Sequence, residues 1–213
     1  MKPILFNTAM VRAILDGEKT CTRRVIKLPK HIEKQRNGLY ILCAEGSTYS
    51  DKEFKDVIDY INPPYKVGDI LYIRETWANT WTPDGDVGFV YKADGEPKNF
   101  PYWGNAKRGK HEVWMPSIHM PKEAARVFLK VISVRAERLK DITDEGCYQE
   151  GISGTSFYDE AEHIQIAGIG LNDSLERTAF SLLWNSTVRE EKYSWEGNPW
   201  VWIIGFKRIE SVK

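Results

Sequence analysis

The strongest constraint on the fold is a stretch of alternating apolar side chains at residues 126–138. Apolar residues occupy both parities of this stretch, with Val127, Leu129 and Val131 on one and Phe128, Ile132 and Val134 on the other. Since successive side chains of a strand point to opposite faces, the stretch predicts a strand that is apolar on both faces. Two shorter runs, residues 70–73 and 200–206, are nearly continuous in β-branched and aromatic residues and predict further strands buried on both faces.

Three short helices are expected between the predicted strands. These helices and their expected N-caps are 8–15 with Thr8, 139–150 with Thr143, and 175–184 with Asp173. Strands and helices do not alternate along the chain, which favours an α+β fold with a small mixed β-barrel over a doubly wound sheet. We interpret residues 1–213 as one domain with insertions at about 28–63, 78–112 and 153–172.

Composition excludes several classes of protein. The chain has 213 residues, of which 42% are apolar, and thirty Lys and Arg balance thirty Asp and Glu. A net charge of zero excludes the broad cationic field of a protein that coats nucleic acid, although a local basic groove is compatible with it. Apolar runs are far shorter than the roughly 20 residues of a membrane span, and no secretory signal is recognisable. We therefore expect a cytoplasmic protein. A monomer is our expectation for its oligomeric state, which no feature of the sequence sets.

The cysteines and histidines form no metal-binding pattern. The three cysteines lie in no CxxC pair, and the four histidines lie in no HxxxH or HxE pattern. The sequence thus predicts reduced thiols, no metal and no cofactor. It also argues against the zinc-dependent nucleobase deaminases, which need such ligands to activate water.

The first candidate site is residues 19–24, which read Lys-Thr-Cys-Thr-Arg-Arg. Its cations and hydroxyls can hold an anionic group. Like-charge repulsion can also lower the pKa of Lys19 until its amine accepts a proton from a threonine, which then becomes a nucleophile. Cys21 is a second possible nucleophile, because nearby cations favour a thiolate. The alternatives are a solvated basic turn and an inert buried cysteine.

Two further segments are candidates for chemistry or binding. Glu150 ends the helix predicted at 139–150, where a helix C-terminus favours cations, so another reason for a carboxylate is needed. Catalysis is one reason, and an ordinary exposed glutamate is the alternative. In the segment 114–121, Ser117 and His119 can hydrogen bond to a nucleobase, although a lone histidine is more often structural. Trp77 can stack on a base.

Taken together, three motifs resemble the ASCH domain family, in particular the larger members common in bacteriophages and prophages. They are Gly-Glu-Lys-Thr-Cys-Thr-Arg-Arg at 17–24, Gly-Asp-Ile-Leu-Tyr-Ile-Arg-Glu at 68–75, and Leu-Lys-Asp-Ile-Thr at 139–143 continuing to Gln-Glu-Gly at 149–151. The resemblance covers residues 3–27, 64–77, 114–152 and 176–209. It implies a PUA-like β-barrel with flanking short helices and loop or hairpin insertions.

The resemblance also implies an activity. Some short bacterial ASCH proteins are amidohydrolases that convert N4-acetylcytidine to cytidine and acetate with a Lys, a Thr and a Glu. Their motifs match Lys19, Thr22 and Glu150 in this sequence. We expect Lys19 to act as the base, Thr22 to attack the acyl carbonyl, and Glu150 to position the lysine or activate water. This chain is about twice as long as those enzymes, so its insertions can reshape the pocket.

The same comparison suggests the substrate and its contacts. We expect a modified nucleoside or RNA as partner, with neither membrane nor metal. The predicted substrate-binding residues are Arg24, Thr20, Arg74, Glu75, Trp77, Ser117 and His119. Two alternatives stay open: a ribonuclease, and a non-catalytic RNA-binding PUA-like module. The cations that can line a groove in the second alternative are Arg23, Arg24, Arg74, Lys107, Arg108 and Lys110.

Overall fold

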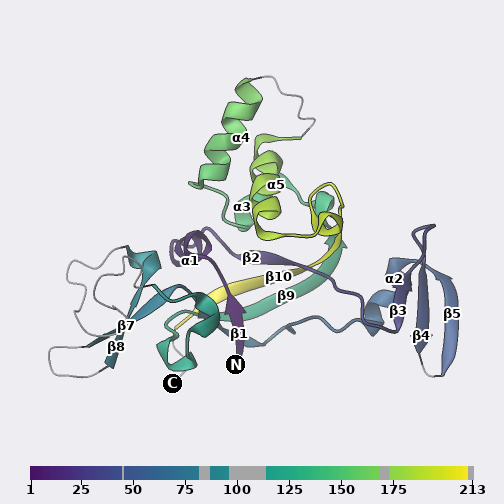
Figure 1. Cartoon of the computed structure of the whole chain (residues 1–213), viewed down its shortest axis with the longest axis horizontal. Helices are drawn as coiled ribbons and strands as arrows, with labels where there is room; N and C mark the ends of the chain where they lie inside the picture. Colours follow the sequence, from purple (N-terminus) through teal and green to yellow (C-terminus); the bar gives the residue numbers. More distant parts are fainter. Residues whose placement is uncertain (45, 82–86, 96–113, 168–172, 211–213) are drawn as a thin grey trace.

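A five-stranded sheet forms the centre of the protein. The computed structural model describes residues 1–44, 46–81, 87–95, 114–167 and 173–210. The strand order is β1 (Lys2–Leu5), β6 (Ile70–Arg74), β9 (Phe128–Arg138), β10 (Trp200–Ile209) and β2 (Cys21–Val25). β1 and β6 are parallel, and the other neighbours are antiparallel. Figure 1 shows β9 and β10 as long, curved strands beside β2.

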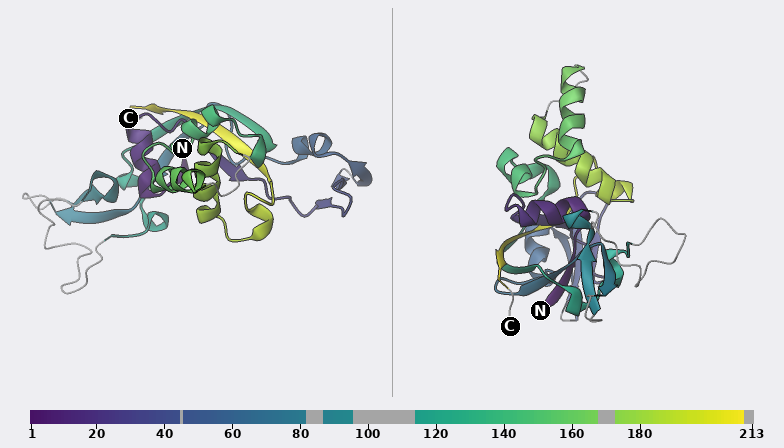
Figure 2. Two further views of the ribbon diagram at one scale, coloured as in Figure 1. Left: turned by 90° about the horizontal axis from the view of Figure 1, so that it is seen from above. Right: turned by 90° about the vertical axis from the view of Figure 1, so that its left-hand side faces the viewer.

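The remaining elements lie around this sheet. β3 (Ile32–Lys34), β4 (Tyr40–Ala44) and β5 (Ser47–Lys52) form a separate sheet, and β7 (Trp77–Trp81) and β8 (Val87–Tyr91) form a hairpin. The helices are α1 (Thr8–Leu15), α2 (Phe54–Val57), α3 (Asp144–Gln149), α4 (Ser156–Ile166) and α5 (Leu175–Thr187), with short 3-10 turns between elements. The three-stranded sheet and the hairpin lie at opposite ends of the molecule, and α3, α4 and α5 gather beyond one face of the central sheet (Figures 1 and 2).

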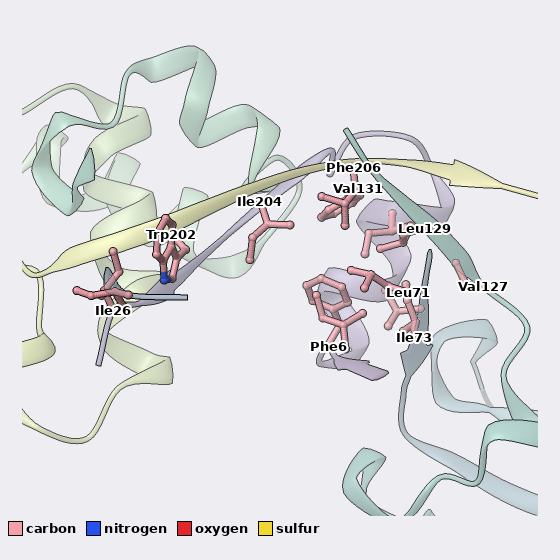
Figure 3. Packing of buried hydrophobic residues seen from close by; sticks show 14 of the residues in the cluster. Phe6, Ile26, Leu71, Ile73, Val127, Leu129, Val131, Trp202, Ile204 and Phe206 are labelled. Carbon is pink, nitrogen blue, oxygen red and sulfur yellow. The ribbon is translucent and has the colours of Figure 1, made fainter. Parts of the chain in front are cut away.

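Two apolar cores cover the two faces of the central sheet. On one face Trp202, Ile204 and Phe206 belong to one cluster with Leu129 and other side chains of β1, β6 and β9. Figure 3 shows Phe206 near Val131 and Trp202 beside Ile26. On the other face Val201 and Ile203 pack with buried residues of α3 and α5. The prediction that the last strand is buried on both faces is therefore confirmed. β6 differs, because Leu71 and Ile73 are buried while their neighbours along the strand are only half-buried.

Most predicted elements are present, with shifted ends. Asn7 rather than Thr8 caps α1, because its side chain accepts a hydrogen bond from the Met10 N–H. Ser174 rather than Asp173 caps α5, and Asp173 pairs instead with Arg177 at 2.9 Å. The predicted cap Thr143 is confirmed, although α3 begins only after it and a 3-10 turn occupies residues 139–141.

The expected insertions contain structure of their own. Residues 28–63 hold β3, β4, β5 and α2, and the described part of 78–112 holds most of the β7–β8 hairpin and a 3-10 turn at Lys92–Asp94. Residues 153–172 were interpreted as an insertion with no helix assigned to it, and α4 occupies much of this stretch. The sequence did not predict this helix, because the helix buries only Ala161 fully. A helix that buries so little needs no apolar stripe, and its sequence shows none. The α+β class is confirmed, and the barrel stays a prediction because the strand order runs from edge to edge.

Candidate active site

Lys19 and Glu150 meet in the interior of the protein. The Lys19 ammonium donates to Glu150 Oε2 at 2.6 Å and to the Glu150 carbonyl oxygen at 2.8 Å. The Lys19 side chain is 0% exposed and the Glu150 side chain 4%. Glu150 is the C-cap of α3, so the ammonium lies at the negative end of that helix. This cation removes the conflict that a carboxylate at a helix C-terminus otherwise creates.

Gly151 allows the end of α3 to approach α1 this closely. Its φ is +78°, and a Cβ built on it would lie 2.8 Å from the Ala13 Cβ and 3.0 Å from the Lys19 Cβ. A side chain here would therefore be strained and would displace Lys19. Lys19 is also held through its backbone, because its N–H donates to the Ala13 carbonyl at 2.9 Å.

Arg23 extends the pair into a four-residue cluster. Its guanidinium donates to Glu150 Oε1 at 3.2 Å and to Glu137 Oε1 at 2.9 Å. Burial alone would lower the pKa of Arg23, but Glu150 and Glu137 among other neighbours outweigh burial and raise it above its ordinary value. The cluster of Lys19, Arg23, Glu137 and Glu150 holds two cations and two carboxylates, so its formal charges cancel.

Thr22 lies in β2 beside this cluster and is 3% exposed. Thr22 and Glu150 both line a small cavity of about 60 Å³. The other residues of its lining are Met10, Arg23, Arg24, Phe180, Leu183, Trp184 and Thr187. β2 is the last strand in the order of the central sheet, and the cavity lies between this edge and helices α1 and α5. A hydroxyl, a carboxylate and an apolar wall therefore border one small cavity.

Arg24 borders the same cavity two positions beyond Thr22, on the same face of β2. Its guanidinium donates to the Leu5 carbonyl at 2.9 Å and lies 5.6 Å from the centre of the Phe6 ring. The Lys19 ammonium lies 5.7 Å from the centre of the same ring, so Phe6 contacts both cations. Burial lowers the pKa of the Arg24 guanidinium, but an arginine stays charged. Arg24 is thus a half-buried positive group beside Thr22 and Glu150 in the lining of the cavity.

Cys21 is poorly suited to act as the nucleophile. Burial, followed by the charge of Glu150, raises the pKa of its thiol from 9.0 to about 12, against the opposing effect of Lys19 and Arg23. A thiol with such a pKa is protonated near neutral pH, and a protonated thiol is a weak nucleophile. The structure favours the alternative of an inert buried cysteine.

The predicted residues divide into those the structure brings to the cavity and those it does not. Thr22, Glu150 and Arg24 line it, whereas Lys19 is not part of its lining and is linked to it through the contact with Glu150. Thr20 is exposed and contributes backbone contacts, since its N–H donates to the Gln149 carbonyl and its carbonyl accepts from the Phe206 N–H, both at 2.9 Å.

A second group of predicted binding residues does not line this cavity. Arg74 donates to the Ile118 carbonyl, and its own carbonyl accepts from the Phe6 N–H. Glu75 is 1% exposed and is paired with Arg126 at 3.0 Å. Trp77 is buried in a separate small core.

The remaining predicted residues are more exposed or lie outside the described residues. Ser117 is half-buried and His119 is exposed, both on one 3-10 turn. Lys107, Arg108 and Lys110, three cations of the alternative RNA groove, lie outside the described residues.

Sequence reasoning did not assign Arg23 and Glu137 to the catalytic set. Arg23 was visible only as part of a basic segment. Glu137 gave no signal, because it lies in the alternating strand β9 and 114 residues separate it from Arg23. Their pairing depends on β2 and β9 both flanking β10 in the sheet.

Within the described part of the chain, no cluster of three or more metal-ligating side chains is present. No helix in that part is long and apolar enough to cross a bilayer. Comparison of the chain with protein-family models, curated proteins and solved structures finds no match in any of the three. The site must therefore be interpreted from its own chemistry and from the motifs in the sequence.

Proposed function

We propose that the protein is an amidohydrolase that removes a small acyl group from N4-acylated cytidine, with N4-acetylcytidine as the expected substrate. The observation that carries the proposal is the buried contact of Lys19 with Glu150. Glu150 also lines, together with Thr22, the small cavity beside this contact. The motifs that resemble the ASCH family predict the same three residues, and with them a PUA-like barrel.

The size of the cavity supports a small acyl group. Pockets that enclose a whole drug-sized ligand have volumes of about 300 to 1,000 Å³. The cavity at Thr22 is about 60 Å³, which suits an acetyl group but not a nucleoside. Its apolar walls, Met10, Phe180 and Leu183, fit a methyl group. The nucleoside would then lie outside it, beyond Arg24.

In the proposed first step the Thr22 hydroxyl oxygen bonds to the acyl carbon while its proton passes to Lys19. This requires a neutral amine, which the pair can provide by moving a proton across the 2.6 Å contact from Lys19 to Glu150. Such a transfer leaves the total charge of the buried cluster unchanged. Arg24 is positioned to stabilise the oxyanion that forms on the acyl oxygen.

In the second step the carbon–nitrogen bond breaks, and Lys19 returns the proton to the leaving N4 nitrogen. This releases cytidine and leaves an acyl ester on Thr22. Water then attacks the ester, with the neutral Lys19 as base, or with Glu150 as base once the shared proton has returned to Lys19. The proton taken from water passes to the Thr22 oxygen as the ester bond breaks, which releases the carboxylic acid and restores the threonine. Each proton taken by Lys19 is thus returned within one cycle.

The test is mass-spectrometric detection of cytidine after incubation of the purified protein with N4-acetylcytidine. We expect turnover by the natural sequence, and a loss of at least about a hundredfold in Lys19→Ala, Thr22→Ala and Glu150→Ala. Matched controls are Thr48→Ala and Lys207→Ala, which replace exposed residues of β5 and β10. Absence of turnover by the folded natural protein would refute the proposal.

A further inference from the structure

Three neighbouring cavities follow strand β2. The cavity at Thr22 shares Arg24 with a second cavity of about 430 Å³, and the second shares Lys27 with a third of about 600 Å³. We infer that these cavities form one groove for single-stranded RNA. The substrate of the proposed hydrolysis would then be an acylated cytidine within an RNA strand. This inference rests on the proposed function and adds the class of its substrate.

The order of the cavities follows the direction of the strand. In Figure 1, β2 runs from α1 toward the three-stranded sheet of β3, β4 and β5. The first cavity is lined by Thr22 and the third by Ile26, four positions further along. At about 3.3 Å per residue, these positions are about 13 Å apart. A ligand that filled all three cavities would be longer than one nucleoside.

The second cavity has the size and lining for the nucleoside itself. Its volume of about 430 Å³ falls in the usual range for small-molecule sites, which is about 300 to 1,000 Å³. Trp202, Tyr65 and Pro64 provide apolar walls, and Arg24 and Lys27 lie at its two junctions with the neighbouring cavities. A cytidine bound here would extend its acyl group toward Thr22.

The third cavity is positively charged. Four cations line it, Lys27, Lys34, Arg138 and Lys192, against one carboxylate, Glu190. Glu190 pairs with Lys192 at 2.8 Å. The other three cations form no ion pair among the residues that the structure describes. On a chain with zero net charge, this local excess of three positive charges is suited to the phosphates of a nucleic acid strand.

Arg138 is held in position at this cavity. Its guanidinium lies 4.7 Å from the centre of the Trp200 ring and donates to the Asn198 carbonyl at 3.0 Å. Phe54 stacks on Trp200 as well, with ring centres 4.1 Å apart. Since Phe54 and Arg138 each need a face of the ring, Trp200 is not a platform for a base. Its role is to orient Arg138, as a phosphate site requires.

The insertion at 28–63 supplies one part of the wall of the third cavity. Lys34, Tyr40 and Phe54 all come from this segment. The motifs that carry the resemblance lie outside it, so the third cavity is a feature of this chain that those motifs do not predict. The groove gives the insertion a function, which is to extend a nucleoside site into a site for a polymer.

The test compares N4-acetylcytidine with a short single-stranded RNA that carries one N4-acetylcytidine. We expect kcat/KM to be at least about tenfold higher for the RNA. Lys34→Glu and Arg138→Gln should each lower kcat/KM for the RNA about fivefold and leave that for the nucleoside unchanged. Lys207→Glu, an exposed position on β10, is the charge-matched control. Lys34 is exposed, so its replacement does not threaten folding.

The outcomes separate this inference from the proposed function. Equal activity on both substrates, unaffected by Lys34→Glu and Arg138→Gln, would refute the groove and leave the hydrolase intact. If neither substrate is hydrolysed, the hydrolase is refuted and fluorescence anisotropy with an unmodified, labelled RNA tests the groove alone. If three cations contact phosphates, a plot of the logarithm of the association constant against the logarithm of the salt concentration should have a slope of about −2. Absence of RNA binding would then refute the groove too.

Discussion

Glu150→Gln should destabilise the protein strongly, whatever its effect on activity. Glu150 is the counterion of both Lys19 and Arg23, and all three side chains are at most 4% exposed. Removal of one partner from a buried ion pair costs about 3 to 5 kcal/mol, because the other charge stays buried without compensation. Arg23 keeps Glu137 at 2.9 Å, so most of the cost should arise at Lys19.

A double-mutant cycle isolates that coupling. Lys19→Met alone should cost about 3 kcal/mol, since it leaves Glu150 with Arg23 as its sole cation in the cluster. The double variant Lys19→Met with Glu150→Gln removes both charges of the pair. We expect it to cost less than the sum of the single variants by at least about 1 kcal/mol.

Urea unfolding followed by circular dichroism measures these free energies. In a chain of this size the expected loss for Glu150→Gln corresponds to a decrease in Tm of about 6 to 20 °C. Glu145→Gln, an exposed position in the same helix, is the control and should change stability by less than about 0.5 kcal/mol. Strict additivity of the two single variants, or a change in Glu150→Gln no larger than in the control, would refute the buried pair.

Three further predictions follow from the cavity, the turn after α3 and the thiols. Leu183→Ala enlarges the cavity. The ratio of turnover of N4-butyrylcytidine to turnover of N4-acetylcytidine should therefore rise. An unchanged ratio would place the acyl group elsewhere. Gly151→Ala should cost at least about 1 to 2 kcal/mol in urea unfolding because of its positive φ, whereas wild-type stability would contradict the tight turn. Burial raises the pKa of Cys21 and Cys147 from 9.0 to about 12. The stability that the two protonated, buried thiols contribute is therefore complete below pH 9 and is lost as the pH rises toward 12. For each thiol, the free energy of unfolding should fall by about 1.4 kcal/mol per pH unit in this range. Unfolding free energies at about pH 8 and pH 10 check this, with Cys43→Ser, an exposed thiol, as control.

Local patterns in the sequence predicted much of the fold. The alternation at 126–138 and the run at 200–206 became the two longest strands among those described, because strand periodicity depends on neighbouring residues alone. Helix caps were less certain, since a polar side chain one position away can serve instead, as Asn7 does for Thr8. The helix α4 was missed because its sequence carries no apolar stripe.

The candidate site was partly accessible in the same way. Lys19, Thr22 and Glu150 stand in short motifs, so their identity could be predicted without knowing where they meet. The pairing of Arg23 with Glu137 could not be predicted in this way. The two residues come into contact only because the order of strands in the sheet places β2 and β9 on either side of β10.

The sequence by itself predicted the strands β6, β9 and β10, the helices α1, α3 and α5, and the short motifs that hold Lys19, Thr22 and Glu150, because each of these depends on side chains close together in the chain. Only the tertiary structure decided that Lys19 is buried against Glu150, that Thr22 borders a cavity, and that three cavities follow β2. Burial, ion pairing and cavity size depend on which distant segments pack together. Side chains separated by more than a hundred residues become neighbours only when the sheet and its helices assemble.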